Sequence, residues 1–201
     1  MAFITHLSAK TKTAAAVLAV LPLVFLPHMA AAESITVVRA AGTVTPSGQM
    51  DVGSRFQTAL PESLQTALRQ GVPLHFTLDY RLSRPTLPAY RFRLGQLVGS
   101  DYSVAYRLSY HPLTNRYRVT VGTFSSDYNS LDTALRGIGA IANWRVLPPD
   151  TLSGYETRRI KAEVRLSLST AQLPKPFQIN SITAQNWQLD SGWKALNISG
   201  N

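Results

Sequence analysis

Residues 74–82 have the sequence Leu-His-Phe-Thr-Leu-Asp-Tyr-Arg-Leu, and this stretch decides the fold. An apolar side chain stands at every second position from Leu74 to Leu82, and the positions between them are polar or charged. Because successive side chains of a β-strand point to opposite faces, this period of two predicts a strand with one buried and one solvated face. Strands of this kind are typical of antiparallel sheets.

The same alternation recurs on both sides of this stretch. It predicts further strands at residues 34–44, 90–94, 104–110, 117–121, 144–147 and 160–168, with terminal strand material around 177–179 and 187–189. Residues 111–115 contain Pro112 and Asn115, which favour a turn and predict a hairpin. Pro85 and Pro88 predict irregular backbone over residues 84–89.

Two short helices and two irregular segments complete the prediction. Pro61 and the fourfold spacing of Leu60, Leu64 and Leu68 predict a helix over residues 61–70. A second helix, capped by Asn129 or Ser130, is expected to end near Asn143 and to turn four apolar side chains inward, those of Leu131, Leu135, Ile138 and Ile141. Pro46, Gly48 and Gly53 predict a loop, and residues 173–176 favour extended backbone. We therefore expect a mainly β protein, an antiparallel β-sandwich-like domain of about seven or eight strands with two short helices.

The N-terminal segment has the three parts of a secretory signal in order. Lys10 and Lys12 supply positive charge, residues 14–26 are apolar apart from Pro22, and residues 30–32 are three alanines suited to cleavage. The apolar run is shorter than the roughly 20 residues that a spanning helix needs. The sequence thus predicts a cleaved signal peptide at residues 1–32 and an exported protein, periplasmic if the source is a Gram-negative bacterium.

The remaining 169 residues suit one domain, which we place at residues 33–194, with a frayed tail at 195–201. There is no cysteine, so disulfides, thiol catalysis and thiolate metal sites are excluded. Loss of Lys10 and Lys12 with the signal leaves 18 basic and 11 acidic residues, a net charge of +7. Fifteen of the 18 are arginine, which binds carboxylate and phosphate through two parallel hydrogen bonds.

The strand phases predict where these arginines lie. If the apolar positions face the core, six arginines face outward and form a candidate binding surface for an anion or a partner: Arg81, Arg91, Arg93, Arg107, Arg118 and Arg165. Outward positions of a sheet are polar in any case, and cross-strand ion pairs with acidic residues are the structural alternative. An envelope protein or anionic lipid headgroups are the expected partners, and nucleic acid is not expected.

Catalytic and metal-binding constellations are missing from the sequence. His75 and His111 are the two histidines beyond residue 32, and neither belongs to a metal-binding or nucleophile motif. We expect no metal, no cofactor and no catalytic residue that the sequence identifies. The sequence leaves the question of an enzyme open and favours a non-enzymatic domain.

Three series of residues resemble a known family. They are Arg107-Leu-Ser-Tyr-His-Pro-Leu-Thr-Asn-Arg-Tyr-Arg-Val119, Ser130-Leu-Asp-Thr-Ala-Leu135, and Leu173-Pro-Lys-Pro-Phe-Gln178 followed by Trp187 and Trp193. The chain resembles the domain-of-unknown-function 4390 family over residues 34–193. The resemblance implies an exported bacterial protein without an assigned activity.

The expected function is therefore that of an exported cell-envelope binding or accessory domain that engages a protein or anionic partner through its arginine-rich sheet face. One alternative is a small-ligand carrier with an aromatic-lined cavity between the sheets, formed by tyrosines such as Tyr80 and Tyr106. Another is a hydrolase whose carboxylate site cannot be recognised in the sequence.

Overall fold

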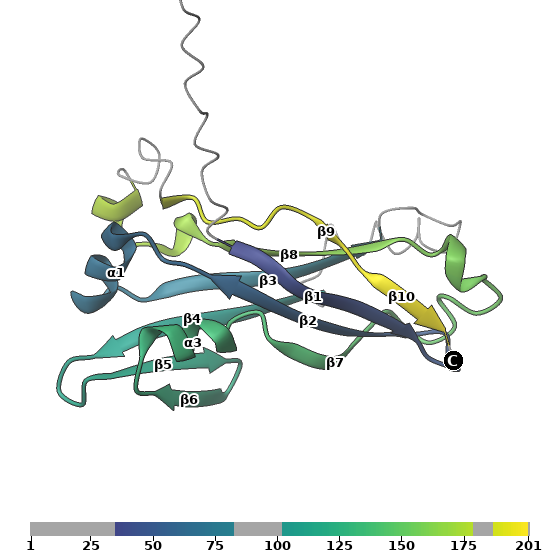
Figure 1. The fold of residues 1–201 in the computed structure, drawn as a ribbon, viewed down its shortest axis with the longest axis horizontal. Coiled ribbons are helices and arrows are strands. Elements are labelled where there is room, and N and C mark those ends of the chain that lie inside the picture. The colour runs from purple at the N-terminus through teal and green to yellow at the C-terminus, as the bar shows by residue number, and fades with distance from the viewer. Residues whose placement is uncertain (1–34, 83–101, 179–186, 201) are drawn as a thin grey trace, which may run out of the picture. The chain divides into compact units, whose positions relative to one another are not determined.

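The computed structural model describes residues 35–82, 102–178 and 187–200, which form two β-sheets and two α-helices (Figure 1). The strands are β1 (Ile35–Val44), β2 (Met50–Thr58), β3 (Leu74–Leu82), β4 (Ser103–His111), β5 (Arg116–Val121), β6 (Phe124–Tyr128), β7 (Ile141–Val146), β8 (Ala162–Leu168), β9 (Lys194–Ala195) and β10 (Asn197–Gly200). The helices are α1 (Glu62–Arg69) and α3 (Leu131–Gly137), with 3₁₀ turns at Thr157–Arg159 and Thr170–Gln172.

The strands are arranged in one four-stranded and one six-stranded sheet. The order is β10-β1-β2-β7 in the first and β6-β5-β4-β3-β8-β9 in the second, and every pair is antiparallel except β1 with β10. The expected mainly β, sandwich-like fold is confirmed. The predicted strand at 90–94, the irregular segment at 84–89 and the proposed signal peptide lie outside the described residues.

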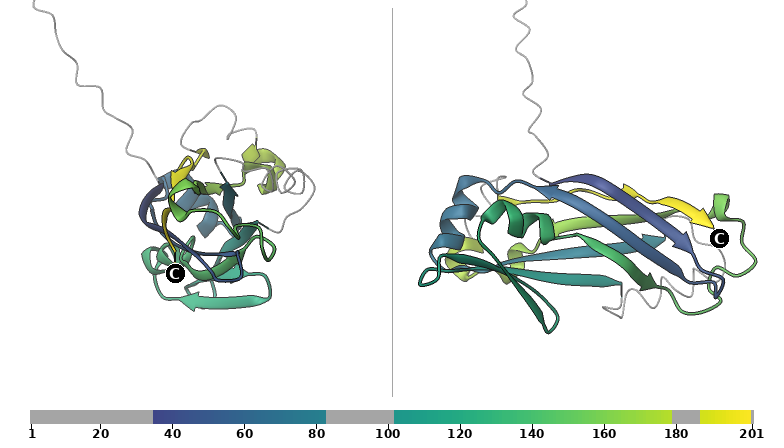
Figure 2. Two further views of the ribbon diagram at one scale, coloured as in Figure 1. Left: turned by 90° about the vertical axis from the view of Figure 1, so that its right-hand side faces the viewer. Right: turned by 60° about the horizontal axis from the view of Figure 1, so that its bottom comes forward.

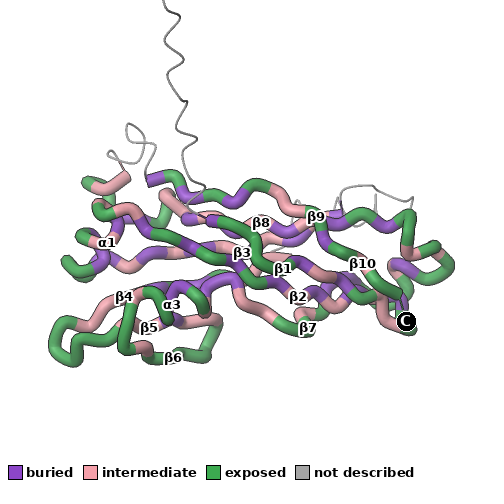
Figure 3. Tube along the Cα trace, in the orientation of Figure 1, coloured by how far each residue is buried: buried purple, intermediate pink, exposed green. Residues whose placement is uncertain are grey.

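Buried and more exposed residues alternate along the strands of both sheets (Figure 3), and the buried apolar residues form one core. In β3, every residue of the apolar set from Leu74 to Leu82 is buried, while the residues between them are half-exposed. Tyr80 joins the two sheets, since its hydroxyl lies 3.6 Å from Met50 Sδ of β2 and its ring meets Trp144 of β7 edge-on at 6.4 Å. Burial of these rings and aliphatic chains is the main stabilising contribution to such a fold.

The loop predicted from Pro46, Gly48 and Gly53 is wrong at Gly53, which lies within strand β2. The inward positions of β2 alternate as Met50, Val52, Ser54, Phe56 and Thr58, all buried. The two hydroxyl residues on the inward face hid this alternation. Ser54 is accommodated in the core because its Oγ donates a hydrogen bond to the carbonyl of Gly139 at 2.9 Å. The extra strand β6 was missed as well, because its residues are polar and mostly exposed.

Helix α3 ends at Gly137, about two turns earlier than predicted. Gly139 has a φ of +73°, a conformation that side chains other than glycine rarely adopt, and the chain leaves it as strand β7. Ile141, which the helical spacing placed on the inward face of α3, is instead the first residue of β7. At the other end, Ser130 caps the helix as predicted, with its Oγ accepting a hydrogen bond from the Thr133 amide.

The C-terminal segment pairs with both sheets. Residues expected to fray form β9, which pairs with β8, and β10, which runs parallel to β1 from Ala41 to Val44. Leu196 is buried between these two pairings, so the tail is held by the core. Extended backbone was predicted for residues 173–176 and strand for 177–179, but residues 175–178 form a helical turn in which the Phe177 amide donates to the carbonyl of Pro174 at 2.9 Å.

Candidate functional site

Two surfaces of the described chain carry features that suit binding. The first is the solvated face of the six-stranded sheet, which we call the arginine face. It contains four of the predicted arginines, Arg81 on β3, Arg107 on β4, Arg118 on β5 and Arg165 on β8, all at half-exposed or exposed positions. Arg91 and Arg93 lie outside the described residues.

Three of these four arginines are paired with acidic residues on a neighbouring strand or segment. Arg81 pairs with Glu163 at 2.8 Å, and Arg118 pairs with Asp127 through two hydrogen bonds of 2.7 and 3.0 Å. Arg165 pairs with Asp190, with its Nε donating to Oδ1 at 2.8 Å. The side chain of Arg107 has no acidic partner among the described residues. These four arginines therefore form a mosaic of opposite charges in which the guanidinium of Arg107 is unbalanced, and the exposed Arg116 of β5, in phase with Arg118, is likewise without an ion pair among the described residues.

Trp193 is stacked on this face between two of the arginines. The Cζ atom of Arg81 lies 4.0 Å from the Trp193 ring centroid, and that of Arg165 lies 5.9 Å from it. Both distances are within the range of cation–π attraction. We call Arg81, Trp193 and Arg165 the arginine–tryptophan stack. Sequence analysis assigned Trp193 no role, because it lies far from Arg81 along the chain and only folding brings the two together.

The pKa values of two carboxylates near the stack, those of Asp79 and Asp190, are shifted in opposite directions. Burial raises the pKa of Asp79, Asp190 adds to this by repulsion, and Arg165 opposes it. Burial also raises the pKa of Asp190, but hydrogen bonds from Arg165 and from the Gly192 amide outweigh it, so that this pKa falls below its ordinary value. Asp190 thus holds its negative charge and fixes the guanidinium of Arg165.

The two histidines lie apart from the stack. Burial lowers the pKa of His75, and the charge of neighbouring Arg107 lowers it further, so the neutral form of His75 is favoured. His111 ends β4, and its Nε2 atom is buried without a hydrogen-bond partner among the described residues. Within residues 35–82, 102–178 and 187–200, no three histidine or carboxylate side chains are grouped so that they could hold a metal ion.

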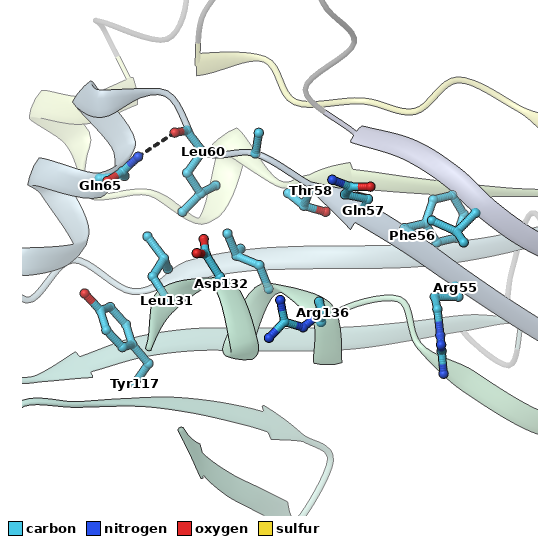
Figure 4. A pocket seen from close by; sticks show the side chains of 13 residues that line it. Arg55, Phe56, Gln57, Thr58, Leu60, Gln65, Tyr117, Leu131, Asp132 and Arg136 are labelled. Atoms are coloured by element: carbon cyan, nitrogen blue, oxygen red, sulfur yellow. Dashed lines mark hydrogen bonds between the residues drawn. The ribbon is translucent and has the colours of Figure 1, made fainter. Parts of the chain in front are cut away.

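The second surface is an open groove of about 1050 Å³ between the end of β2 and helix α3 (Figure 4). We call it the β2 groove. Its lining residues are Val38, Arg55, Phe56, Gln57, Thr58, Ala59, Leu60, Gln65, Tyr117, Leu131, Asp132, Leu135 and Arg136. Helix α3 lies between β2 and the β5–β6 hairpin (Figures 1 and 2).

The positions of the groove walls follow from local packing. Strand β2 is tied to the segment after α3 by the hydrogen bond from Ser54 to Gly139. Gly137 brings the end of α3 so close to Tyr128 that a Cβ atom there would lie 2.9 Å from the tyrosine hydroxyl oxygen. Tyr117 of β5 and the half-buried Leu131 contribute apolar surface to the opposite wall.

The charged side chains of the β2 groove form no ion pair in the described part of the chain. Arg55 and Asp132 are exposed, and so is Arg136, which donates a hydrogen bond to Thr133 Oγ1 at 3.1 Å. Thr58 is 8% exposed, and its buried Oγ1 atom has no hydrogen-bond partner among the described residues. The sequence pattern does not predict this site, because the loop predicted from Pro46, Gly48 and Gly53 overlaps the start of β2 and hides the strand.

Comparison with known proteins gives a family match. A family model described as "Domain of unknown function (DUF4390)" matches residues 32–197, which confirms the resemblance inferred from the motifs. None of the curated proteins and none of the solved structures compared with the chain matches it. No helix in the described ranges is both long enough and apolar enough to span a membrane.

Proposed function

We propose that this chain, which belongs to the DUF4390 family, is an exported cell-envelope domain that binds a protein partner through the arginine face and catalyses no reaction. The observation that carries the proposal is the arginine–tryptophan stack, in which the Trp193 ring centroid lies 4.0 Å from Arg81 Cζ. Tryptophan and arginine are among the residues most enriched at the positions that dominate the binding energy of protein interfaces.

The ion pairs prepare the stack for binding. Glu163 and Asp190 hold the guanidinium groups of Arg81 and Arg165 against the indole ring. Side chains that are already ordered lose less conformational entropy when a partner binds. The indole of Trp193 is half-buried, so its exposed part offers a rigid apolar contact at the centre of a charged surface.

The charge pattern favours a protein over a membrane surface as the partner. Attraction to anionic headgroups depends on unneutralised basic residues. Of the four predicted arginines that the structure describes on this face, three are paired with carboxylates, and Arg107 and the nearby Arg116 of β5 are left without an ion pair among the described residues. A mosaic of this kind is matched by a protein surface with the complementary arrangement of charges.

Photocrosslinking from Ala105, an exposed residue of β4 near Arg107, tests this proposal. In the native envelope, we expect a crosslinker there to capture one protein, and we expect Trp193→Ala and Arg107→Glu to remove the product. Arg69→Glu on helix α1 is the matched control and should retain it. Loss of the product in the control, or retention in both face variants, would contradict the proposal.

Anionic lipid as the partner would give a different result. The purified protein would then bind phosphatidylglycerol vesicles, and Arg107→Glu would release it without any protein crosslink. Circular dichroism of each variant establishes that the fold is intact. Trp193→Phe should capture more of the partner than Trp193→Ala does, since the phenylalanine ring can still contact the guanidinium of Arg81.

Export is the other part of the proposal, and it rests on the sequence of residues 1–32. N-terminal sequencing of the protein from an envelope fraction should find Glu33 or a residue next to it as the first residue. An intact Met1 would contradict cleavage. The small-ligand carrier and the hydrolase stay alternative predictions. A ligand that co-purifies with the protein would favour the carrier, and turnover of an envelope polymer would favour the hydrolase.

A further inference from the structure

Strand β2 has an unpaired edge inside the β2 groove. On the side of β7, its pairing ends at Ser54 opposite Ile141, and from Arg55 to Thr58 it pairs with β1 alone among the described strands. Backbone N–H and C=O groups of a strand point alternately to its two edges. About half of the peptide groups of these four residues therefore face the groove, and no backbone hydrogen bond joins them to a described segment other than β1.

The groove beside this edge has room for an added strand. Its volume is about 1050 Å³, and it is bounded on the far side by α3 and by Tyr117 of β5. Four residues of β-strand cover roughly 13 Å of edge. A segment placed here would continue the line of β7 along β2, so the four-stranded sheet would be completed without a change in its register.

The side chains around the edge indicate which sequence fits. In β2, Phe56 and Thr58 face the core, while Arg55 and Gln57 face solvent. An added strand follows the same alternation, so that one set of its side chains meets the apolar wall at Leu131. The other set lies on the solvated side.

The charged residues of the groove indicate which side chains the added strand carries on its solvated side. Arg55 and Arg136 both line the groove without an acidic partner in the described residues, and Asp132 is the one carboxylate in the lining. Acidic side chains would form charge-assisted hydrogen bonds with these guanidinium groups.

The two internal segments between the described ranges do not have this composition. Residues 83–101 contain three arginines and one aspartate, and residues 179–186 contain no charged residue. We propose that the β2 groove binds an extended segment of a partner protein, with alternating apolar and acidic side chains, as an added strand along Arg55–Thr58. This proposal concerns a surface separate from the arginine face and does not depend on it.

The test uses a labelled, end-capped octapeptide of alternating valine and glutamate and the purified protein, with binding measured by fluorescence anisotropy. We expect saturable binding, and at least tenfold weaker binding when lysine replaces glutamate in the peptide. The double variant Arg55→Glu with Arg136→Glu should reverse this preference. The matched control, Arg69→Glu with Arg158→Glu, changes two exposed arginines outside the groove and should keep it.

Backbone methylation separates strand addition from simple charge attraction. Two further peptides carry N-methyl groups, on the valines in one and on the glutamates in the other. In a strand, these two sets of N–H groups point to opposite edges. We expect one peptide to lose at least tenfold in affinity and the other to bind like the parent peptide.

Several results would overturn the proposal. They are the absence of binding by the parent peptide, equal binding of both methylated peptides, and unchanged preference in the Arg55 and Arg136 double variant. Self-association of the protein in analytical ultracentrifugation, abolished by the same double variant, would show that a second copy occupies the groove. Trp193 does not line the groove, so Trp193→Ala should bind the peptide like the unmodified protein. The peptide assay therefore tests the groove independently of the arginine face.

Discussion

Gly139 is the position at which a single methyl group should have the clearest effect on stability. Its φ is +73°, and a Cβ atom there would lie 2.8 Å from Leu166 Cδ2 and 2.9 Å from Phe56 Cδ2. Both neighbours are fully buried, so neither can swing into solvent. The left-handed backbone costs a residue with a Cβ roughly 1–2 kcal/mol, and forced rearrangement of a packed core costs roughly 1–3 kcal/mol. We expect Gly139→Ala to lower the free energy of unfolding by about 2–5 kcal/mol.

Gly122→Ala is the matched control, and urea unfolding followed by circular dichroism is the assay. Gly122 has a φ of +57°, and no described atom lies within 4 Å of the position that a Cβ would take, so this substitution introduces the backbone cost alone. The difference between the two variants isolates the clash with Leu166 and Phe56, at roughly 1–3 kcal/mol. If Gly139→Ala costs no more than Gly122→Ala, the close packing of the segment between α3 and β7 is refuted.

Three further predictions concern the polar side chains of Ser191, His75 and Tyr106. Ser191→Ala should lower the free energy of unfolding by about 1–3 kcal/mol, because its buried Oγ accepts a hydrogen bond from the Leu166 amide at 2.9 Å. The pKa of His75, measured by NMR, should lie below 6.5 and should rise in Arg107→Gln, because burial and then Arg107 lower it. Because the folded pKa is the lower one, the stability that neutral His75 contributes is present above pH 6.5 and is lost as the pH falls from there toward the folded pKa. Burial raises the pKa of Tyr106 to about 12, so Tyr106 should not contribute to the tyrosine ionisation seen near pH 10 in an ultraviolet titration. The absorbance change near pH 10 should therefore be the same in Tyr106→Phe as in the unmodified protein.

Ser125→Ala is the control for Ser191→Ala. It removes an exposed hydroxyl of β6 that bonds to Thr120, and its effect on stability should be much smaller than that of Ser191→Ala. Equal effects would contradict the structural role of Ser191. A His75 pKa at or above 6.5, or one that does not respond to Arg107→Gln, would contradict the environment of β3 and β4. Loss of a component near pH 10 in Tyr106→Phe would show that its ring is not buried.

The sequence predicted a strand correctly where the polarity of each residue matches its burial in the fold. In β3, β4, β5 and β8, strong alternation predicted the strands, and Leu74, Phe76 and Leu78 are buried as their phase required. It failed at β2, where Ser54 and Thr58 occupy inward positions. Periodicity weighs a residue by its own polarity, whereas the cost of burying Ser54 is offset by Gly139, which lies 85 residues away in the chain.

The candidate sites show the same division. The outward phase of Arg81, Arg107, Arg118 and Arg165 followed from local alternation, but their ionic partners did not. Arg81 meets Glu163 only because β8 pairs with β3 in one particular register. A shift of that register by one residue would place the acidic side chain on the opposite face.

By itself, the sequence determined the mainly β architecture, the face of each alternating strand, the absence of disulfides and the family of the chain, because these depend on local pattern and composition. The tertiary structure alone decided that β10 pairs with β1, that Trp193 stacks between Arg81 and Arg165, and that the edge of β2 opens into a groove beside α3. These features join segments far apart in the chain. They arise from the packing of two sheets into one core, which no local window of sequence contains.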